Sequence, residues 1–127
     1  MPKGPLVGAA GIAVADLARS VDFYTRVAGM TELMKLRLPD MDEVIVGYPG
    51  SKGAAVVLMQ YTDGSGPPTD LRGKLVLYVP DPVGFAEAVA AEGLEVPRPP
   101  EPVAELRGAL VGFVKDPDGH TIELLQG

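Results

Sequence analysis

Apolar and polar positions follow two kinds of pattern along this chain, and these patterns come in the same order in both halves. In the first half, an apolar run at residues 8–15 precedes a helical pattern that extends to about Ala28. Strand-like runs follow near residues 31–38, 43–48 and 54–61. Alternation with a period of about two predicts a strand, whereas a period of about 3.6 predicts a helix. The first half therefore predicts a βαβββ unit.

Capping residues mark both ends of the predicted helix in the first half. Asp16 is a favourable N-cap, because its carboxylate can accept a hydrogen bond from a backbone N–H of the first turn. Gly29 suits the left-handed conformation with which many helices end. Leu17, Val21 and Tyr24 fall on one helical face, so we expect this helix to pack on a sheet.

The second half of the chain repeats this plan. Lys74–Val79 predicts a strand, Asp81 predicts an N-cap with Pro82 at the first helical position, and Gly93 predicts the end of the helix. The remaining strand-like runs lie at residues 94–98, 104–114 and 120–126. The second half therefore predicts another βαβββ unit.

Two segments that contain proline predict departures from regular strands. The run Pro97–Pro102 is unsuited to a central strand, because proline cannot donate a hydrogen bond to a neighbouring strand. We expect an edge strand or an irregular segment there. Asp116–Gly119 predicts a tight turn, since Pro117 occupies the position at which its fixed backbone angle is favourable.

A spacing of 65 residues relates the two halves in sequence. Val14–Asp16 corresponds to Val79–Asp81, and Gly47 corresponds to Gly112. A repeat at a fixed spacing indicates two copies of one supersecondary unit.

The repeat predicts the fold class. We expect an α+β fold in which two βαβββ modules, residues 8–61 and residues 72–126, are related by a pseudo-twofold axis. A linker at residues 62–71 would join them within a single domain over residues 1–127. Together the modules would form a curved mixed sheet around a cup.

Composition limits the classes of function. The chain has 127 residues, of which 46% are hydrophobic and 22% are charged, as is typical of a soluble globular domain. No apolar run reaches the roughly 18 residues of a membrane-spanning helix, and the start lacks the apolar stretch of a secretory signal. A net charge of -6 argues against nucleic acid as a partner, and the absence of cysteine makes a cytoplasmic location the default expectation.

Two segments of the chain resemble the vicinal oxygen chelate superfamily, which includes glyoxalase I, extradiol dioxygenases and bleomycin-resistance proteins. They are GIAVADLARSVDFYTRVAGM at residues 11–30 and GFVKDPDGHTIEL at residues 112–124. These segments match the opening strand-helix motif and the closing hairpin of that family, and the resemblance covers essentially the whole chain. It implies the fold predicted above. It is less specific about function, because this superfamily hosts isomerases, lyases, oxygenases and binding proteins.

The resemblance also implies where a metal would bind. Members with a metal carry His or Glu on the first and fourth strands of each module, at positions that match Ala9, Leu58, Lys74 and Glu123. The spacing of 65 residues pairs the same positions, Ala9 with Lys74 and Leu58 with Glu123. Only Glu123 can bind a metal in its ordinary state, whereas a catalytic site needs about three protein ligands. We therefore expect that the metal site has been lost and that no cofactor binds.

A shifted strand register is the alternative. It would bring Gln60, Asp42 or Glu43 into the site, so a divalent metal is not excluded.

Strand alternation assigns the side chains that would line the cup. If Leu58 and Glu123 point inward, neighbours two residues away along each strand do so as well. Ala9, Gly11 and Ala13 would leave room for a ligand on the opposite wall. The expected ligand-binding side chains are Val56, Leu58, Gln60, Val76, Tyr78 and Thr121, with Arg37 at the mouth. Arg37 could bind an anionic group, although a solvated strand face explains it equally well.

Lys74 and Glu123 are the candidate catalytic residues. If both point inward, the ammonium group of Lys74 could occupy the space of the metal and neutralise Glu123. Lys74 could then polarise a carbonyl group of the ligand, and Glu123 could transfer a proton. An ion pair without a chemical role, or a Lys74 that extends into solvent, are the alternatives.

Two functions from different classes stay open. The first is a metal-free small-molecule-binding protein whose ligand is apolar or cationic. The second is an enzyme, a lyase, isomerase or dioxygenase of the glyoxalase superfamily. It would be either metal-independent through Lys74 and Glu123 or metal-dependent through ligands not recognised here. In both cases the expected partner is a small molecule, and sheet edges that need cover favour a homodimer.

Overall fold

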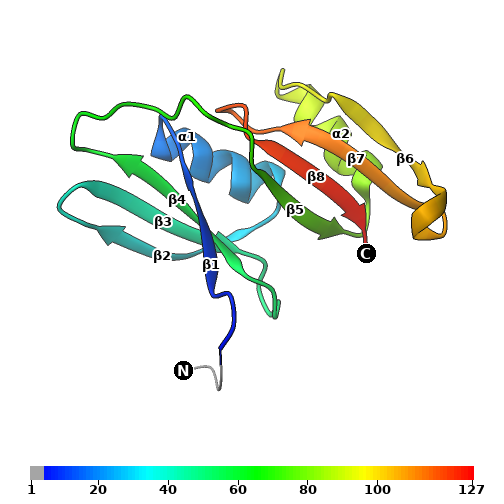
Figure 1. The fold of residues 1–127 in the computed structure, drawn as a ribbon, viewed down its shortest axis with the longest axis horizontal. Helices are drawn as coiled ribbons and strands as arrows, with labels where there is room; N and C mark the ends of the chain where they lie inside the picture. Colours follow the sequence, from blue (N-terminus) through cyan, green and yellow to red (C-terminus); the bar gives the residue numbers. More distant parts are fainter. Residues whose placement is uncertain (1–4) are drawn as a thin grey trace. The chain divides into compact units, whose positions relative to one another are not determined.

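The computed structural model describes residues 5–127, which divide after Pro68 into two compact units (Figure 1). The boundary lies within the segment 62–71, and residues 62–73 contain no helix or strand. Each unit has the element order βαβββ and contains one four-stranded mixed sheet. The α+β class is therefore confirmed. We refer to residues 5–68 as unit 1 and to residues 69–127 as unit 2.

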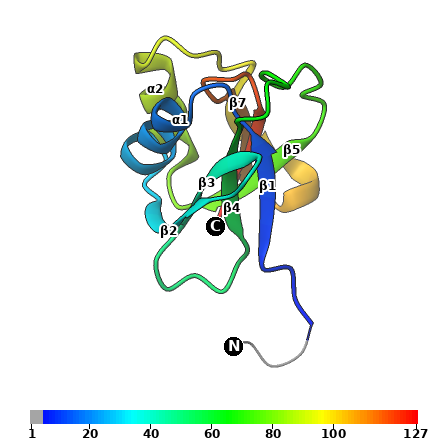
Figure 2. The ribbon, with the colours of Figure 1, turned by 90° about the vertical axis from the view of Figure 1, so that its left-hand side faces the viewer.

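Unit 1 forms a sheet with the strand order β1-β4-β3-β2. Its strands are β1 (Ala9–Ala13), β2 (Thr31–Arg37), β3 (Met41–Gly47) and β4 (Ala55–Tyr61). β1 runs parallel to β4, whereas β3 is antiparallel to both of its neighbours. Helix α1 (Leu17–Asp22) continues as the π-helical segment η1 (Phe23–Val27) and packs against β3 and β4. Figure 2 shows α1 to one side of β1, β3 and β4.

The predicted helix ends in unit 1 are confirmed. The Asp16 carboxylate accepts a hydrogen bond from the Arg19 backbone N–H at 3.1 Å, and Gly29 adopts a left-handed conformation with φ of 78°. Tyr24 is fully buried, whereas Leu17 and Val21 are half-buried. The core of unit 1 thus lies between this helical face and the side of the sheet that it covers.

Unit 2 forms a sheet with the strand order β5-β8-β7-β6. Its strands are β5 (Lys74–Val79), β6 (Arg98–Val103), β7 (Ala109–Lys115) and β8 (Thr121–Gln126). Helix α2 (Pro82–Ala91) begins after its N-cap Asp81, whose side chain accepts a hydrogen bond from the Gly84 N–H. The buried side chains between α2 and the sheet include Leu77, Val89, Ile122 and Leu124.

Two predicted strands of unit 2 begin later than the sequence pattern indicates. Residues 94–97 are not a strand, because Leu94 hydrogen bonds back to Val89 and completes the end of α2. The proline-rich run instead forms β6, an edge strand with an irregular register, as expected for this composition. β7 begins at Ala109, because a 3-10 turn, η2 (Ala104–Leu106), precedes it.

The tight turn at residues 116–119 is confirmed. The Gly119 N–H donates to the Asp116 carbonyl oxygen at 2.9 Å, and Gly119 has a φ of 91°. The buried Asp116 carboxylate accepts hydrogen bonds from the backbone N–H groups of Asp118 and His120.

No helix within residues 5–127 is long and apolar enough to cross a membrane.

Candidate functional site

Each sheet has one side covered by a helix and one side without a helix, which we call the helix side and the helix-free face. Residues directly opposite each other on paired strands point to the same side of a sheet. Ala9 pairs with Ala55, and Gly11 pairs with Val57. A Cβ atom built on Gly11 would lie 3.1 Å from Cε of Met59, which places Met59 on the same face. The helix-free face of unit 1 therefore carries Ala9, Gly11, Val57 and Met59.

The expectation that Val56, Leu58 and Gln60 share a face with Ala9 is wrong. These three side chains lie on the helix side, where Val56 and Leu58 are buried. The Oε1 atom of Gln60 accepts a hydrogen bond from the Leu17 N–H of α1 at 2.7 Å. Val57, not Leu58, is the β4 residue that shares the helix-free face with Ala9.

A change in the repeat spacing explains this correction. The residue numbers of Gly11 and Val76 differ by 65, whereas those of their partners Val57 and Glu123 differ by 66. A shift of one residue moves a strand side chain to the other side of the sheet. The fixed spacing is correct for β1 and β5, but it gives the wrong side for β4.

The structure brings the predicted residues of unit 2 together on one face. β5 pairs with β8 so that Lys74 lies opposite Thr121, Val76 opposite Glu123, and Tyr78 opposite Leu125. The ammonium nitrogen of Lys74 lies 2.5 Å from Oε1 of Glu123. The Glu123 side chain is 14% exposed and the Lys74 side chain is 52% exposed, so the carboxylate is the more enclosed partner. Lys74 also lies over the Phe113 ring, 5.9 Å from its centroid.

A hollow of about 570 Å³ adjoins this ion pair. Its wall includes Tyr78, Glu123 and Leu125 from the paired strands, together with Leu106 from the 3-10 turn. The Tyr78 side chain is 72% exposed and Val76 is 43% exposed. The Thr121 hydroxyl, in contrast, accepts a hydrogen bond from the Lys115 ammonium group at 2.7 Å. The hollow thus combines the apolar side chains Tyr78, Leu106 and Leu125 with charged groups: Glu123 of the ion pair, and Glu105 and Arg107 beside the 3-10 turn.

The helix-free face of unit 1 is also apolar and exposed. Leu33 and Met34 of β2 are 54% and 52% exposed. Both lie on this face because the strand register shifts between Glu32 and Met34: Met34 pairs with Ile45, and Leu33 lies beside Gly47. Glu43 pairs with Met59 and therefore belongs to this face. Exposed apolar patches on a soluble protein often mark an interaction or binding site.

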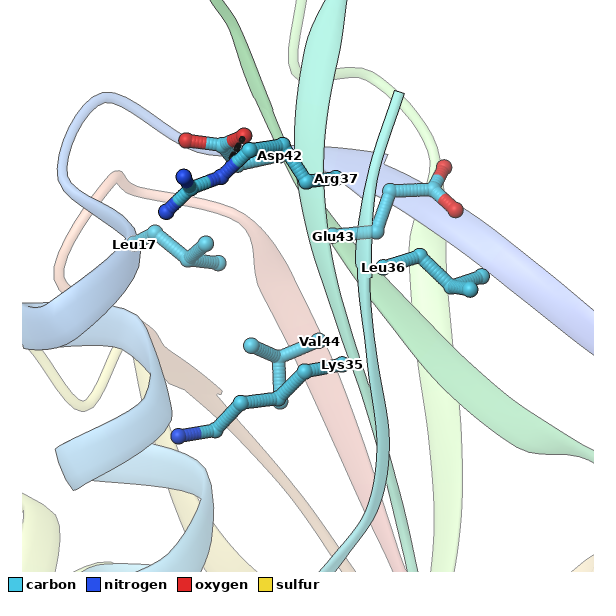
Figure 3. Close-up of a pocket in the computed structure, with 7 residues that line it drawn as sticks. All are labelled: Leu17, Lys35, Leu36, Arg37, Asp42, Glu43 and Val44. Atoms are coloured by element: carbon cyan, nitrogen blue, oxygen red, sulfur yellow. Dashed lines mark ion pairs between the residues drawn. The ribbon is translucent and has the colours of Figure 1, made fainter.

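Arg37 does not lie where the cup was expected. It pairs with Asp42 on the neighbouring strand, and its Nε atom lies 3.7 Å from the Asp42 carboxylate. Figure 3 shows Arg37 and Asp42 on the side of the strands that faces Leu17 of α1, whereas Glu43 and Leu36 point to the other side. Arg37 therefore belongs to the helix side.

A shifted strand register was expected to bring Gln60, Asp42 or Glu43 into a metal site, but these residues lie on different sides of the unit 1 sheet. Gln60 and Asp42 are on the helix side, and Glu43 alone is on the helix-free face. Within residues 5–127, no three His, Cys, Asp or Glu side chains are grouped so that they could hold a metal ion.

Sequence reasoning missed Val57, Met59 and Leu106. Val57 and Met59 share a face with Ala9 through the register of β1 against β4, which alternation within each strand does not fix. Leu106 lies in a turn, and the pattern of apolar residues there predicts a strand.

Comparisons with known proteins identify the family and the fold of this chain. Residues 6–124 match the family described as Glyoxalase/Bleomycin resistance protein/Dioxygenase superfamily. No match was found among curated protein sequences.

Several solved structures are similar to the chain. Glyoxalase I from Zea mays is 28% identical with a TM-score of 0.78; the match covers 94% of this chain and 43% of that chain. This chain therefore spans less than half the length of the maize protein. A member of the same superfamily from Sphaerobacter thermophilus is 27% identical with a TM-score of 0.76 and coverage of 97% and 98%. TnmS3, an antibiotic-binding protein from a Streptomyces species, shares the fold at 24% identity, with a TM-score of 0.77 and coverage of 99% and 98%.

Proposed function

The chain belongs to the glyoxalase/bleomycin resistance protein/dioxygenase superfamily, and from this membership we propose that it is a small-molecule-binding protein. The ligand lies against the helix-free face of unit 2, over Tyr78 and the Lys74–Glu123 ion pair. One observation carries the proposal: the exposed Tyr78 ring and the Glu123 carboxylate, which pairs with Lys74, line the same hollow of about 570 Å³. Small-molecule sites combine an apolar lining with a few polar groups in this way.

We propose that this binding does not use the metal of the superfamily. Glu123 is the carboxylate at the matching position in unit 2, and it is already paired with Lys74. In unit 1, the matching positions Ala9 and Leu58 carry hydrocarbon side chains, and so does Val57, which takes the place of Leu58 on the helix-free face. A divalent ion in a catalytic site needs about three protein ligands. This donor set does not fit such an ion, and no step of the function is assigned to one.

The ligand that fits this face is apolar or cationic. The Tyr78 ring can stack on an apolar body or contact a cation through its face. Leu106 and Leu125 extend the apolar surface, and Glu123 can accept a hydrogen bond from a cationic group. The net charge of -6 attracts cations rather than anions.

The test is a thermal-shift screen with neutral and cationic aromatic compounds. A ligand of the native state raises Tm. We expect Tyr78→Ala to abolish the Tm shift for every compound that binds. Glu123→Gln should weaken the binding of cationic compounds only. The matched control is Glu87→Gln, which removes the same charge from an exposed residue of α2. Compounds that stabilise Tyr78→Ala as much as the unaltered protein would overturn the proposed site.

The metal-free part of the proposal has its own test. Elemental analysis of the purified protein and thermal shifts with divalent ions measure metal binding directly. We expect no bound metal and no shift. A stoichiometric transition metal whose removal lowers Tm would contradict metal-free binding without affecting the assignment of the Tyr78 face.

A metal-independent lyase or isomerase is the second candidate function. The Lys74–Glu123 pair supports it, because an ammonium group and an enclosed carboxylate can polarise a carbonyl group and transfer a proton. Turnover that is lost in both Lys74→Met and Glu123→Gln, with folding intact, would favour catalysis. Binding without turnover in the unaltered protein would favour the binding protein.

We also propose that the protein forms a homodimer. β2 is the edge strand of the unit 1 sheet, and every residue of β2 is exposed. Such an edge is usually protected or paired. The cytoplasmic location stays a prediction from the absence of cysteine.

A further inference from the structure

A groove lies between the start of α1 and the helix side of the unit 1 sheet. Its volume is about 530 Å³, and its apolar wall is formed by Leu17, Val21 and Val44. A smaller hollow of about 280 Å³ adjoins it and shares Leu17 and Val44. Figure 3 shows the Leu17 side chain pointing from α1 towards Val44 of β3. The size is within the range of about 300–1,000 Å³ that is typical of small-molecule sites.

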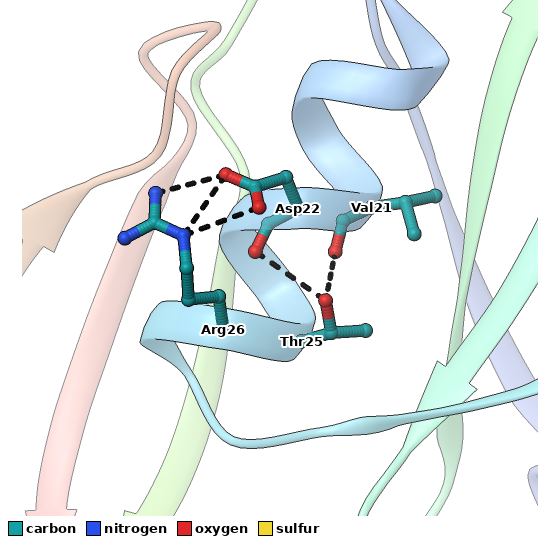
Figure 4. A network of polar contacts seen from close by, with 4 residues as sticks. All are labelled: Val21, Asp22, Thr25 and Arg26. Atoms are coloured by element: carbon teal, nitrogen blue, oxygen red, sulfur yellow. Dashed lines mark hydrogen bonds and ion pairs between the residues drawn. The ribbon is translucent and has the colours of Figure 1, made fainter.

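An unusual helical turn begins where this groove ends. α1 passes after Asp22 into the π-helical segment η1, and both Val21 and Asp22 line the groove. The Thr25 hydroxyl donates to the Val21 carbonyl oxygen at 2.7 Å, while Arg26 pairs with Asp22 on the outer surface (Figure 4). π-helical turns are rare and occur frequently at functional sites. This turn buries Phe23 and leaves Val21 half-exposed at the groove.

Two carboxylates lie at the two ends of the apolar wall. Along β3, Val44 is flanked by Asp42 on one side and by Val46, the partner of Glu32, on the other. The cations that pair with these carboxylates are much more exposed. Arg37 is 91% exposed against 40% for Asp42, at 3.7 Å. Lys35 is 74% exposed against 34% for Glu32, at 3.3 Å.

These ion pairs are easily exchanged. Exposed pairs of this kind contribute little to stability, because solvent screens them and the long side chains lose freedom. A cation on a ligand can therefore replace Arg37 or Lys35 and pair with Asp42 or Glu32. The Gln60 amide is held by its bond to the Leu17 N–H, and its NH₂ group has no hydrogen-bond partner within residues 5–127, so it can donate to a ligand oxygen.

We propose that this groove is a second small-molecule site, which takes an amphipathic cation with a compact apolar body. The apolar body packs on Leu17, Val21 and Val44, and the cationic group pairs with Asp42 or Glu32. This site goes beyond the proposed function, because its residues lie on the helix side of the unit 1 sheet and share none of the side chains of the Tyr78 face.

The test uses three probes with the same apolar body and different charge: 1-adamantanamine, 1-adamantanol and 1-adamantanecarboxylate. Titrations are followed by backbone amide NMR shifts of the full chain. We expect the amine to shift the amides of residues 17–22, 42–44 and 60, and to bind about tenfold more tightly than the alcohol, which corresponds to one favourable charge contact. The carboxylate should bind most weakly.

Variants separate the apolar and the charged parts of the site. Asp42→Asn combined with Glu32→Gln should remove the preference for the amine and leave the affinity for the alcohol unchanged. Ala18→Trp, at an exposed position of α1 that lines the groove, should block all three probes. The matched control is Asp63→Asn, which removes one exposed carboxylate of the same unit and should keep the preference.

Three results would overturn the proposal. They are equal affinity for amine and alcohol, tightest binding of the carboxylate, and no shift of the groove amides at millimolar probe. Shifts confined to residues 74–78 and 121–125 would overturn it and support the Tyr78 site instead. Thermal shifts in Tyr78→Ala test only the Tyr78 site, whereas amide shifts of the groove residues test only the groove. A failure of one proposal is therefore distinguishable from a failure of the other.

Discussion

Gln60 connects the start of a helix to a strand through one side-chain atom. The Leu17 N–H is one of the first groups of α1, which have no acceptor inside the helix, and Gln60 supplies that acceptor at 2.7 Å. Gln60→Leu would leave this N–H without its partner in a half-buried place. We expect a loss of about 1–2 kcal/mol in the free energy of unfolding, measured by urea denaturation.

Gln126→Leu is the matched control for this prediction. Gln126 also accepts a hydrogen bond from a backbone N–H, that of Leu110 at 3.1 Å, but the site is exposed. Water can replace the lost acceptor there, so we expect a loss of under about 0.5 kcal/mol. Equal losses in the two variants would show that the hydrogen bond from the Leu17 N–H to Gln60 contributes no more to stability than an exposed one.

Tyr48 provides a pH-dependent contribution to stability. Burial raises the pKa of the Tyr48 hydroxyl above its ordinary value of 10.0, and the hydroxyl donates to the Ala28 carbonyl oxygen at 2.7 Å. As the pH rises, the unfolded chain releases this proton before the folded chain does. The contribution of Tyr48 is therefore complete below about pH 10 and is lost as the pH rises from the unfolded-state pKa towards the folded-state pKa.

Tyr48→Phe tests this contribution. At neutral pH we expect a loss of about 1 kcal/mol from the missing hydrogen bond. Between pH 9 and pH 11, at about the pKa of tyrosine, the variant should lose less stability than the unaltered protein. Urea denaturation at several pH values measures both effects, and parallel pH profiles would contradict the assignment.

At the scale of elements, two glycines lie in close contacts of different kinds: Gly112 lies against backbone atoms, and Gly47 lies against a flexible side chain. Gly47 and Gly112 correspond in the sequence repeat, yet they lie on opposite sides of their sheets, as their strand partners show. A Cβ on Gly112 would lie 2.8 Å from the backbone nitrogen of Pro100 in the edge strand β6. A Cβ on Gly47 would lie 3.2 Å from Cδ1 of Leu33, the end of a flexible side chain.

The two alanine variants should therefore differ. We expect Gly112→Ala to cost about 2–3 kcal/mol, because the backbone of β6 must move. Gly47→Ala should cost less than about 1 kcal/mol, since Leu33 can change rotamer. Thermal and urea denaturation of both variants give the comparison, and a larger loss in Gly47→Ala would contradict the packing of β6 on β7.

The elements that sequence reasoning predicted well are those with local signals. Asp16 and Asp81 cap their helices as expected, and β5 begins and ends at the predicted residues. These signals depend on neighbouring residues alone, so the rest of the fold does not change them. The proline-rich run was also placed correctly at a sheet edge, because missing N–H groups exclude a central position.

The side of the sheet to which β4 residues point could not be read from the repeat. The extra residue in the spacing of β4 and β8 is invisible in the sequence, and it moves Leu58 to the helix side. The resemblance named Lys74 and Glu123, and the two share a face because Val76, the strand partner of Glu123, lies two residues from Lys74 on β5. The groove beside Val21 was not predicted, because a π-helical turn has no clear sequence signal.

At the scale of the whole molecule, the apolar surface that no helix covers is exposed to solvent. Leu33 and Met34 in unit 1 are more than half exposed, and they lie at the free edge strand β2. A soluble protein rarely leaves such a patch open, and burying it against a second copy stabilises the pair by roughly 25 cal/mol for each Å² of apolar surface.

The homodimer is therefore tested at this edge. Light scattering at micromolar concentration should give twice the chain mass of 13.3 kDa. Leu33→Lys combined with Met34→Lys should give a monomer with unchanged secondary structure, because charged side chains on an exposed edge prevent pairing. Lys35→Gln is the control, since Lys35 lies on the helix side of the same strand. A monomeric unaltered protein would contradict the homodimer. A dimer that persists in the double variant would move the interface away from β2.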